Sequence, residues 1–554
     1  MKVGIRRLRV AGALAALAMV AAGCGFGTTD APDRPLRGGP VDPSAPASHD
    51  GPSTPPFVDP PIGDPAIAQE EAACAAQQQN SPWYRTLQPF EHYDSGRSSL
   101  YPCARFPGSM TGPNVVEAHP TTDVYYSQFD IATRDENDLY VYGGGNGDAN
   151  PPALHTFVAK VEPGTMKQIW RTYLSDARDN NELHVSGAVD VMADGNIVAI
   201  SDHTLYKLDG TTGKILIKQD MPTGSSPPND SAFNGIDAFP DGTIVVRSLN
   251  RPVGCTLNGY SSAAFKCPGA PNSAKPSIIG TVDPETFKVL GWTELKGNVL
   301  GRVTTSRYQG HDYAYITTPT QIYRYVWDGH TITQDTTWGP VTYTRPGQTQ
   351  AGAPVIMGDW VVFSNNGAPA QVPLSVIAIH QGDARRMTRM DPTPTLKPGQ
   401  YSYYYAKVSV DAVNNRIYVM DFGLGTASAI DFRDGRMSLA WKVKQRSNSY
   451  ITLIGPPDKR VFVNANARSK ESDPTKYNPG PIGANYMDQI QWRDARDGGL
   501  LAASDFYPPA TSAGTVPPGY GGLIYDILYE GRAVVLAVRP EETESMSAAE
   551  KKGK

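Results

Sequence analysis

A short pattern that recurs eight times between residues 137 and 536 most constrains how this chain can fold. Each copy has a turn containing Gly, Asn or Asp, followed by a strand in which apolar residues alternate. Such turn residues tolerate the backbone angles of a tight hairpin, and the alternation is typical of a β-strand. The eight copies begin at Asn137, Asp194, Asp241, Gly310, Gly358, Asn414, Asp458 and Glu530.

A second pattern, a strand followed by a polar turn and another strand, comes after the first seven copies. Its copies run over 161–170, 208–216, 282–290, 326–332, 379–383, 430–436 and 492–498. Successive copies begin 47, 74, 44, 53, 51 and 62 residues apart, and the longest spacing contains an excursion with two cysteines. A period near 50 with four short strands per unit is typical of β-propeller blades. The sequence therefore predicts an all-β fold, a single propeller of eight blades, or alternatively seven, each with four antiparallel strands.

Two phrases within the repeats resemble known propeller families. Residues 208–216, Leu-Asp-Gly-Thr-Thr-Gly-Lys-Ile-Leu, resemble the blade motif of quinoprotein-like (PQQ-type) repeats. Residues 235–246 resemble the blades of NHL or strictosidine-synthase-like proteins. The resemblance covers about residues 120 to 540 and implies a propeller there. Quinoprotein dehydrogenases usually carry adjacent cysteines near the cofactor, and this sequence has no Cys-Cys pair. We therefore expect no PQQ.

The last copy of the first pattern has no copy of the second after it. The final blade thus has two strands, near Leu523 and Val534, and lacks its outer part. An N-terminal segment that supplies the missing strands would close the ring and hide its open edges. Residues 93–101 repeat the second pattern, so we predict that they are the donor.

The N-terminus has the features of a bacterial export signal. A basic segment is followed by an apolar segment at residues 10–22, which is too short to span a bilayer, and by a small-residue cleavage site that ends at Cys24. Ala-Ala-Gly-Cys resembles a lipobox, which implies removal of residues 1–23 and lipidation of Cys24, including palmitate. The alternative is an ordinary signal peptide with an incidental cysteine. We expect a lipoprotein tethered to the extracytoplasmic face of the cell membrane.

The rest of the chain divides by composition. Residues 24–67 are rich in Pro, Gly, Ser and Asp and are predicted to form a disordered stalk. Residues 68–118 are an N-terminal extension that carries the ring-closing strands, with a short helix at 70–79. The propeller occupies residues 119–540, and residues 541–554 form a polar tail.

Four cysteines remain after Cys24, and an even number in an exported chain indicates disulfides. Proximity in the sequence favours the pairs Cys74–Cys103 and Cys255–Cys267, one of three possible connectivities. The chain has neither a CxxC motif nor a Cys/His cluster, so we predict no zinc or thioredoxin-type site.

The net charge argues against one class of partner. It is −5 for the whole chain, and loss of the signal with its four positive charges makes it −9. Nucleic-acid binding requires a basic surface, so we expect no nucleic-acid partner.

Acidic side chains recur at the ends of the predicted inner strands. A ring of carboxylates could bind Ca²⁺, but each also precedes a hairpin, where Asp commonly accepts hydrogen bonds from turn amides. We favour the structural role and leave Ca²⁺ as the alternative. The five residues are Asp130, Asp190, Asp237, Asp411 and Asp526.

The starts of the inner strands are expected to line a central channel, where residues from distant repeats meet around one ligand. The predicted ligand-binding residues are His184, Asn234, Arg302, Tyr404 and Tyr450. His184 is the candidate acid or base among them. Neither a Gly-x-Ser-x-Gly nor a His-Glu-x-x-His motif occurs. The leading hypothesis is a non-catalytic module that binds a partner protein or ligand. The alternative is a propeller enzyme, quinoprotein-like or of esterase or transferase type, with a site at the channel mouth.

Overall fold

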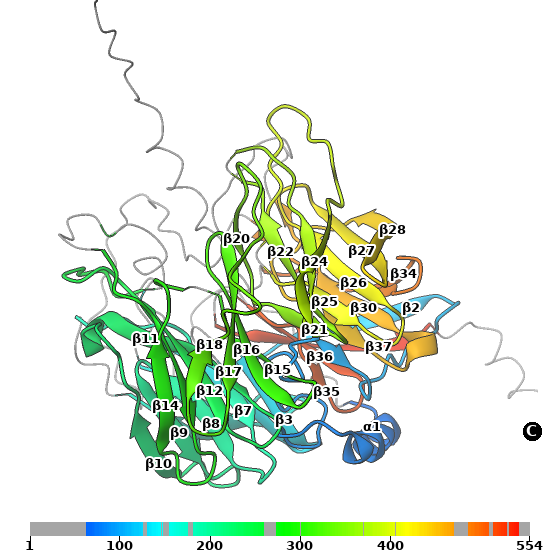
Figure 1. The fold of residues 1–554 in the computed structure, drawn as a ribbon. Helices are drawn as coiled ribbons and strands as arrows, with labels where there is room; N and C mark the ends of the chain where they lie inside the picture. The colour runs from blue at the N-terminus through cyan, green and yellow to red at the C-terminus, as the bar shows by residue number, and fades with distance from the viewer. Residues whose placement is uncertain are drawn as a thin grey trace, which may run out of the picture.

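Eight sheets surround a common centre in the computed structural model of this chain (Figure 1). The structure describes residues 63–123, 125, 130–145, 147, 155–175, 181–259, 267, 273–299, 301–368, 370–404, 406–469, 486–508, 514–528 and 531–541. The predicted signal peptide, Cys24, most of the predicted stalk and all but residue 541 of the predicted tail lie outside these residues. The prediction of an all-β propeller with eight four-stranded blades is confirmed.

The first four blades follow one another along the chain, each as an antiparallel sheet. Blade 1 contains β3 (Asp130–Asp135), β4 (Asp138–Gly143), β5 (Phe157–Val161) and β6 (Gln168–Tyr173). Blade 2 contains β7 (Val189–Val191), β8 (Ile197–Ser201), β9 (Thr204–Leu208) and β10 (Ile215–Asp220). Blade 3 contains β11 (Ser231–Ala238), β12 (Ile244–Asn250), β13 (Ile278–Val282) and β14 (Val289–Glu294). Blade 4 contains β15 (Thr304–Tyr308), β16 (His311–Thr317), β17 (Gln321–Trp327) and β18 (Ile332–Gln334), with β19 (Val341–Thr342) beside β17.

The next three blades repeat this order. Blade 5 contains β21 (Val355–Met357), β22 (Trp360–Asn366), β23 (Val376–His380) and β24 (Asp383–Met390), with β20 (Thr349–Ala351) beside β22. Blade 6 contains β25 (Ser409–Asp411), β26 (Arg416–Asp421), β27 (Thr426–Arg433) and β28 (Arg436–Lys444). Blade 7 contains β29 (Thr452–Ile454), β30 (Val461–Ala465), β33 (Ile490–Asp494) and β34 (Leu500–Ala503). The short strands β31 (Arg468–Ser469) and β32 (Tyr486–Met487) pair with each other.

The repeated sequence patterns correspond to particular strands. Each copy of the first pattern supplies one strand to a different blade, and each copy of the second supplies a hairpin of two strands. In some of these hairpins a glycine allows the turn of one blade to lie directly against an aromatic ring of the preceding blade. Gly213 has a φ of 73°, and a Cβ there would lie 2.6 Å from the ring of Trp170 in the preceding blade. Gly498 lies in the same way against Trp441, with a φ of 80°.

The core lies between neighbouring blades, because each sheet packs one face against the preceding blade and the other face against the following blade. At several of these interfaces a buried tyrosine bridges two blades in the same way. Tyr140 Oη donates to the Gly210 carbonyl at 2.7 Å, and Tyr525 Oη donates to the Pro163 carbonyl at 3.0 Å across the junction of the last and first blades. The interface that closes the ring is therefore built like those within it.

Blade 8 closes the ring with a strand from the N-terminal region. It contains β35 (Pro518–Gly519), β36 (Leu523–Ile527), β37 (Ala533–Pro540) and β2 (Asn114–Pro120). β2 pairs with β37 antiparallel over seven residue pairs, from Asn114↔Pro540 to Pro120↔Val534. Closure by the N-terminal region is thus confirmed.

The predicted donor at residues 93–101 is wrong. Only its last two residues form a strand, β1 (Leu100–Tyr101), and this strand lies parallel to β29 in blade 7. The segment has the turn-like composition of a blade hairpin, but its polar groups bond to other blades in the interior of the ring. A regular seven-residue strand further along the chain takes the open edge instead.

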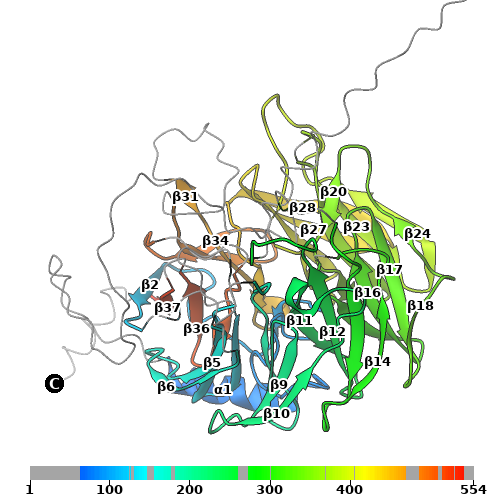
Figure 2. The same cartoon turned by 90° about the vertical axis from the view of Figure 1, so that its left-hand side faces the viewer.

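One helix, α1 (Pro65–Gln77), precedes these segments. It begins five residues before the predicted helix because the side chain of Asp64 caps its first amides and Pro65 occupies the first turn. In Figures 1 and 2, α1 lies at one end of the propeller, and β20 and β31 lie toward the opposite end. We call these the helix end and the loop end.

Both predicted disulfides, Cys74–Cys103 and Cys255–Cys267, are present. The first joins α1 to the segment that precedes β2, and the second lies in the connection between β12 and β13. Among the described residues, no helix is both long and apolar enough to cross a membrane.

Candidate functional site

Residues 80–101, which we call the plug, lie in the middle of the ring. Their side chains are among the most buried in the molecule: Glu91, His92 and Arg97 are each 1% exposed or less. Trp83 and Phe90 stack at 4.4 Å and pack against residues of blades 2 and 3. The centre of the propeller is therefore filled by its own N-terminal region.

Hydrogen bonds join the plug to every blade. Side chains of the plug bond to blades 1, 3 and 4, and a backbone carbonyl of the plug bonds to blade 2. Gln88 Nε2 donates to the Ile131 carbonyl at the start of blade 1, and the Val191 amide of blade 2 donates to Pro89. Arg97 donates to Ile236 of blade 3 at 2.9 Å and to Val303, beside the first strand of blade 4, at 2.7 Å.

The other four blades bond mainly to the plug backbone. The amides of Ile356, Val410 and Leu453, in blades 5, 6 and 7, donate to the carbonyls of three nearby plug residues, Gly96, Ser98 and Ser99. In blade 8 the hydroxyl of Tyr520 lies 2.9 Å from the hydroxyl of Thr86. Because one segment satisfies polar groups of all eight blades, the plug fixes the relative positions of the inner strands.

The plug enters and leaves at the helix end. The amide of Ala193, in the hairpin after β7, donates to Pro82, and Ser81 Oγ donates to Pro240 in the hairpin after β11. The Cys74–Cys103 disulfide flanks the plug on both sides, with a sequence separation of 29. The plug is thus a covalently closed loop inserted into the ring from one end.

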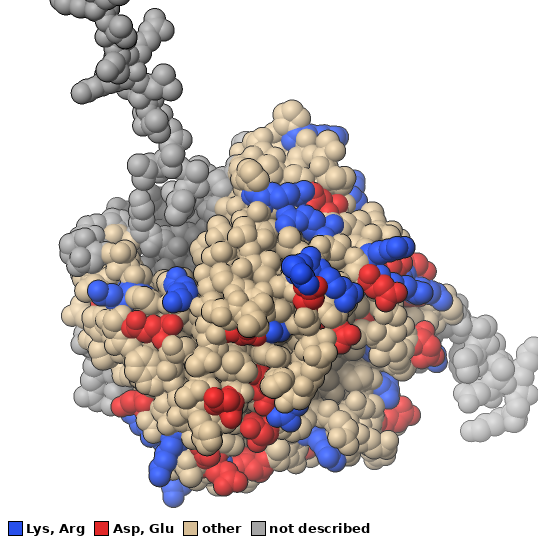
Figure 3. Space-filling model, viewed as in Figure 1, with Lys and Arg blue, Asp and Glu red and all other residues tan. Residues whose placement is uncertain are grey.

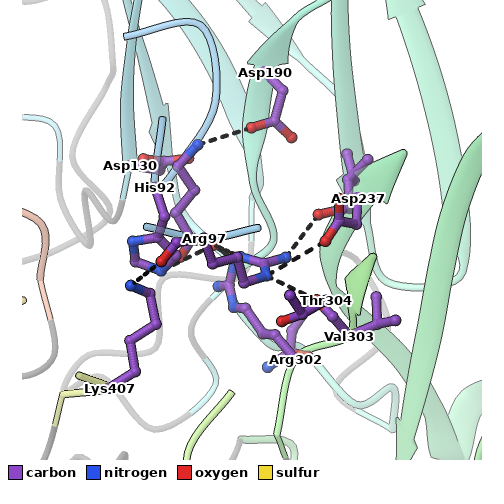
Figure 4. A network of polar contacts seen from close by, with 12 residues as sticks. His92, Arg97, Asp130, Asp190, Asp237, Arg302, Val303, Thr304 and Lys407 are labelled. Atoms are coloured by element: carbon purple, nitrogen blue, oxygen red, sulfur yellow. Dashed lines mark hydrogen bonds and ion pairs between the residues drawn. The ribbon is translucent and has the colours of Figure 1, made fainter. Parts of the chain in front are cut away.

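A polar network surrounds Glu91 (Figure 4). Its Oε2 accepts hydrogen bonds from Arg97 Nη1 at 2.9 Å and from Arg302 Nη1 at 2.5 Å. Arg97 Nε also lies 3.6 Å from Asp237 Oδ2, and the Glu91 amide donates to Asp190. Two plug residues thus bind charged groups of blades 2, 3 and 4 in one buried cluster.

Lys407 of blade 6 completes this network. Its Nζ donates to the Arg97 carbonyl at 2.5 Å and to Ser99 Oγ at 2.9 Å, and the residue is 3% exposed. Burial, together with the positive charge of Arg97, lowers the pKa of Lys407 to about 7. The ammonium therefore holds the plug through neutral acceptors, and near neutral pH a substantial fraction of this lysine is uncharged.

Burial also shifts the acids and the histidine of the network toward their neutral forms. It raises the pKa of Asp237 to about 7, although Arg97 acts in the opposite direction. Burial and the nearby Glu91 carboxylate raise the pKa of Asp130 well above its ordinary value. Burial, with Lys407 next in size, lowers the pKa of His92 well below its ordinary value. Such shifts mark functional sites and structural ion networks alike.

Two of the five predicted ligand-binding residues lie in this network. Arg302 binds Glu91 as described, and the ring of Tyr450 meets that of His92 edge-on at 4.6 Å between centroids. These two residues thus lie near the centre of the ring, and their predicted role in binding a ligand stays a prediction. In the structure, however, their polar and aromatic partners come from the plug.

The other three predicted residues lie in separate pairs. His184 Nδ1 is 2.9 Å from Asp202 Oδ1, and Asn234 Oδ1 accepts a hydrogen bond from Arg247. The amide of Tyr404 donates to Asn366 at 2.8 Å. The structure therefore does not gather the five side chains around a single point.

The five aspartates expected at the inner strands have structural partners. Asp130 accepts a hydrogen bond from the Ile131 amide, Asp237 from the Ala238 amide and Asp526 from the Tyr507 hydroxyl. Asp190 accepts the Glu91 amide and Asp411 binds Arg460. Within the described part of the chain, no group of three or more His, Cys, Asp or Glu side chains is placed to hold a metal ion.

Sequence reasoning missed the plug residues Glu91 and Arg97 and their partner Lys407. Their contacts join residues up to 310 positions apart, so no local pattern reports them. One signal was available: Cys74 and Cys103 bracket a segment dense in aromatic and charged residues, which is unusual for a plain connection.

Comparison with known proteins gives the fold. A scan against protein-family models finds no match, and a search of curated protein sequences finds none either. Solved structures do match. The quinohemoprotein alcohol dehydrogenase from Comamonas testosteroni has a TM-score of 0.52 and 11% identity, with 86% of each chain covered.

Two further solved structures are similar to the same extent. Quinohemoprotein alcohol dehydrogenase ADHIIG from Pseudomonas putida HK5 has a TM-score of 0.52 and 10% identity, covering 86% of this chain and 81% of that one. A europium-containing methanol dehydrogenase has a TM-score of 0.50 and 8% identity, covering 85% of this chain and all of the other. The chain therefore has a quinoprotein-like propeller, and at these identities the likeness extends to the fold alone.

Proposed function

We propose that this chain is a lipid-anchored extracytoplasmic protein whose propeller binds a partner protein or ligand through its loop end. The observation that carries the proposal is the plug, which bonds to all eight blades and occupies the helix end. The tether predicted at Cys24 reaches the propeller through α1, at that same end. The loop end is then the face that a partner can approach.

The loop end has the architecture of a recognition surface. The second strands of blades 1, 3 and 7 end there, and in each the chain runs for more than ten residues before the next strand of the blade. Binding residues commonly lie on such connections. The connection in blade 3 is braced by the Cys255–Cys267 disulfide, and Leu257 beside it is 49% exposed. An exposed apolar side chain on a braced loop offers a preorganised contact for a protein partner, so Leu257 is the residue with which we test this surface.

The alternative is a quinoprotein-like oxidoreductase, favoured by the fold of the dehydrogenases that the chain resembles. The central residues do not fit PQQ, which carries three carboxylates. Arg97 and Arg302 already share Glu91, and the aspartates Asp130, Asp190 and Asp237 lie in the same buried region. A further trianion would find both arginines already paired with Glu91, so the proposal includes no reaction at this centre.

Two matched substitutions test which end binds. Leu257→Asp changes an exposed apolar residue at the loop end, and Val413→Asp changes one that is 65% exposed in the hairpin between β25 and β26, at the helix end. Partners are captured by cross-linking the protein in its native membrane, and ligands are screened by thermal shift. We expect Leu257→Asp to weaken capture or binding by roughly tenfold or more, and Val413→Asp to leave it unchanged. The reverse pattern would overturn the proposal.

The anchor is tested separately. Cys24→Ser should abolish palmitate labelling and leave the precursor unprocessed, because the lipid attaches through that sulfur. Labelling that persists in the variant would remove the lipoprotein part of the proposal while leaving the loop-end part intact.

A further inference from the structure

The outer strands of the blades differ sharply in charge. β24 carries three arginines and one aspartate, and β28 carries one arginine and two lysines with no acidic residue. The outer strands of the other six blades together carry two basic residues and three acidic ones. Positive charge is therefore concentrated on blades 5 and 6 of a chain whose net charge is negative.

β24 and β28 lie side by side, so their charges form one surface. We define the basic rim as four cations and two apolar residues on these strands: Arg385, Arg386, Arg436, Lys442, Met387 and Leu439. Figure 3 shows several Lys and Arg side chains on the upper right of the molecule, where β24 and β28 lie in Figure 1.

Most of this charge faces solvent. Arg385 is 91% exposed and pairs with Asp383, which belongs to the same strand. Arg386 lies over the ring of Trp360 at 5.2 Å, an arrangement that fixes the stem of the side chain without neutralising its charge. Lys442 Nζ donates to the Pro392 carbonyl at 3.1 Å and to Thr393 Oγ1 at 3.2 Å, which are neutral acceptors and leave its charge in place. Exposed ion pairs such as that of Arg385 contribute little to stability, so stability does not explain the concentration of cations.

Apolar side chains are exposed among these cations. Met387 is 37% exposed and Leu439 is 42% exposed. Cations interspersed with exposed apolar groups match the two layers of a membrane interface, in which anionic headgroups overlie acyl chains. A surface for an acidic peptide alone would not require the apolar residues to face outward.

We propose that the basic rim docks the propeller against an anionic phospholipid bilayer. The inference rests on the proposed lipid anchor, which would hold the propeller near the membrane by a stalk of about 40 residues. A chain of that length has an average reach of about 35 Å. Since the protein as a whole is acidic, an anionic bilayer repels most of its surface, and the basic rim is the side on which docking is favourable.

The test removes the anchor, so that its failure and the failure of docking are separate results. The mature chain carrying Cys24→Ser is exported through a non-lipoprotein signal and mixed with vesicles of phosphatidylcholine containing 30% phosphatidylglycerol, or with phosphatidylcholine alone. Co-sedimentation measures partitioning. We expect binding to the anionic vesicles only, with a loss of about tenfold or more in 0.5 M salt.

A matched pair of variants locates the surface. Arg385→Glu, Arg386→Glu and Arg436→Glu together reverse the basic rim. The control reverses three exposed lysines in hairpins of blades 1, 2 and 3, with the same change in net charge: Lys167, Lys214 and Lys288 to Glu. The rim variant should bind anionic vesicles at least tenfold more weakly than the control.

Three results would overturn the proposal. The first is equal binding of the two triple variants, since the effect would then be one of net charge. The second is no vesicle binding by the parent chain. The third is rim-dependent binding of a polyglutamate peptide without vesicle binding, which would assign the rim to an acidic protein partner. Circular dichroism of each variant establishes that it is folded.

Discussion

The blades and the plug are held by opposite kinds of contact. Within most blades, strands that are close in the sequence pair with each other, as in the hairpin of β8 and β9 between Ile197 and Leu208. The plug has little regular structure and bonds to residues far away in the sequence, from Ile131 to Tyr520. The repeats therefore build eight similar sheets, and a non-repeated segment determines how these sheets are positioned relative to one another.

The strongest way to test this comparison is to remove the segment. Deletion of residues 25–120 removes α1, the plug and β2, and thus leaves the edge of β37 and the inner strands without partners. We expect aggregated or unfolded protein, since a long unpaired strand edge promotes association. Deletion of residues 25–62 is the control and should leave the melting temperature nearly unchanged. Equal melting of the two truncations would show that the ring needs no N-terminal region.

A single arginine tests the plug against a blade. Arg97→Met leaves Glu91 and Asp237 short of a buried cation and also removes hydrogen bonds to Ile236 and Val303. Loss of one partner from a buried pair costs about 3–5 kcal/mol, so the free energy of unfolding measured in urea should fall by that amount.

The control for this change is an arginine within one blade. Arg307 pairs with Asp312 across β15 and β16, and its side chain is 47% exposed. Arg307→Met should reduce the free energy of unfolding by about 1 kcal/mol or less. If the two variants are equally stable, the plug does not position the blades as we describe.

The same contrast explains what could be predicted from the sequence. The hairpin at Asp209, Gly213 and Lys214 is local, because Asp209 accepts the amides of the next residues and the glycine provides a positive φ. A local rule therefore identifies the blade. The partners of Glu91 and Lys407 meet only after the ring has closed, and no spacing in the sequence reports it.

Closure itself was predicted for the right region but the wrong residues. The Gly and Ser residues of 93–101 have the composition of a hairpin, and propensity alone cannot distinguish a turn in a blade from a turn in a plug. The strand β2 is not recognisable in the sequence because Asn114–Pro120 lacks a clear alternation of apolar and polar residues. Arg302 and Tyr450 lie near the centre because inner-strand positions converge in any propeller, whatever fills the centre; that they bind a ligand stays a prediction.

The two disulfides differ in position, since one closes the plug and the other braces a loop between two strands of blade 3. Replacement of both cysteines by serine should cost about 3.5 kcal/mol for Cys74–Cys103 and about 3 kcal/mol for Cys255–Cys267, from their separations of 29 and 12 residues. We expect the first variant also to become sensitive to proteolysis near residue 80, because the plug would be held at one end only. Limited proteolysis with mass spectrometry measures this, and cleavage of both variants at the same sites would contradict it.

The smallest expected effect is on the pH dependence of stability. It should differ between a buried aspartate beside the plug, Asp237, and an exposed aspartate in a hairpin, Asp209. The pKa of Asp237 is about 7 in the folded protein and near 4 in the unfolded chain, so between these values the folded state binds the extra proton. Stability from this group is complete below pH 4 and is lost as the pH rises to 7. Asp237→Asn should therefore flatten the decline in unfolding free energy between pH 5 and pH 7 by about 1–2 kcal/mol.

Asp209 has its pKa lowered by hydrogen bonds from Thr212, so it stays ionised throughout that range in both states. Asp209→Asn should leave the slope unchanged, and equal slopes for both variants and the parent would mean that the Asp237 carboxylate is ionised beside Arg97 already at pH 5.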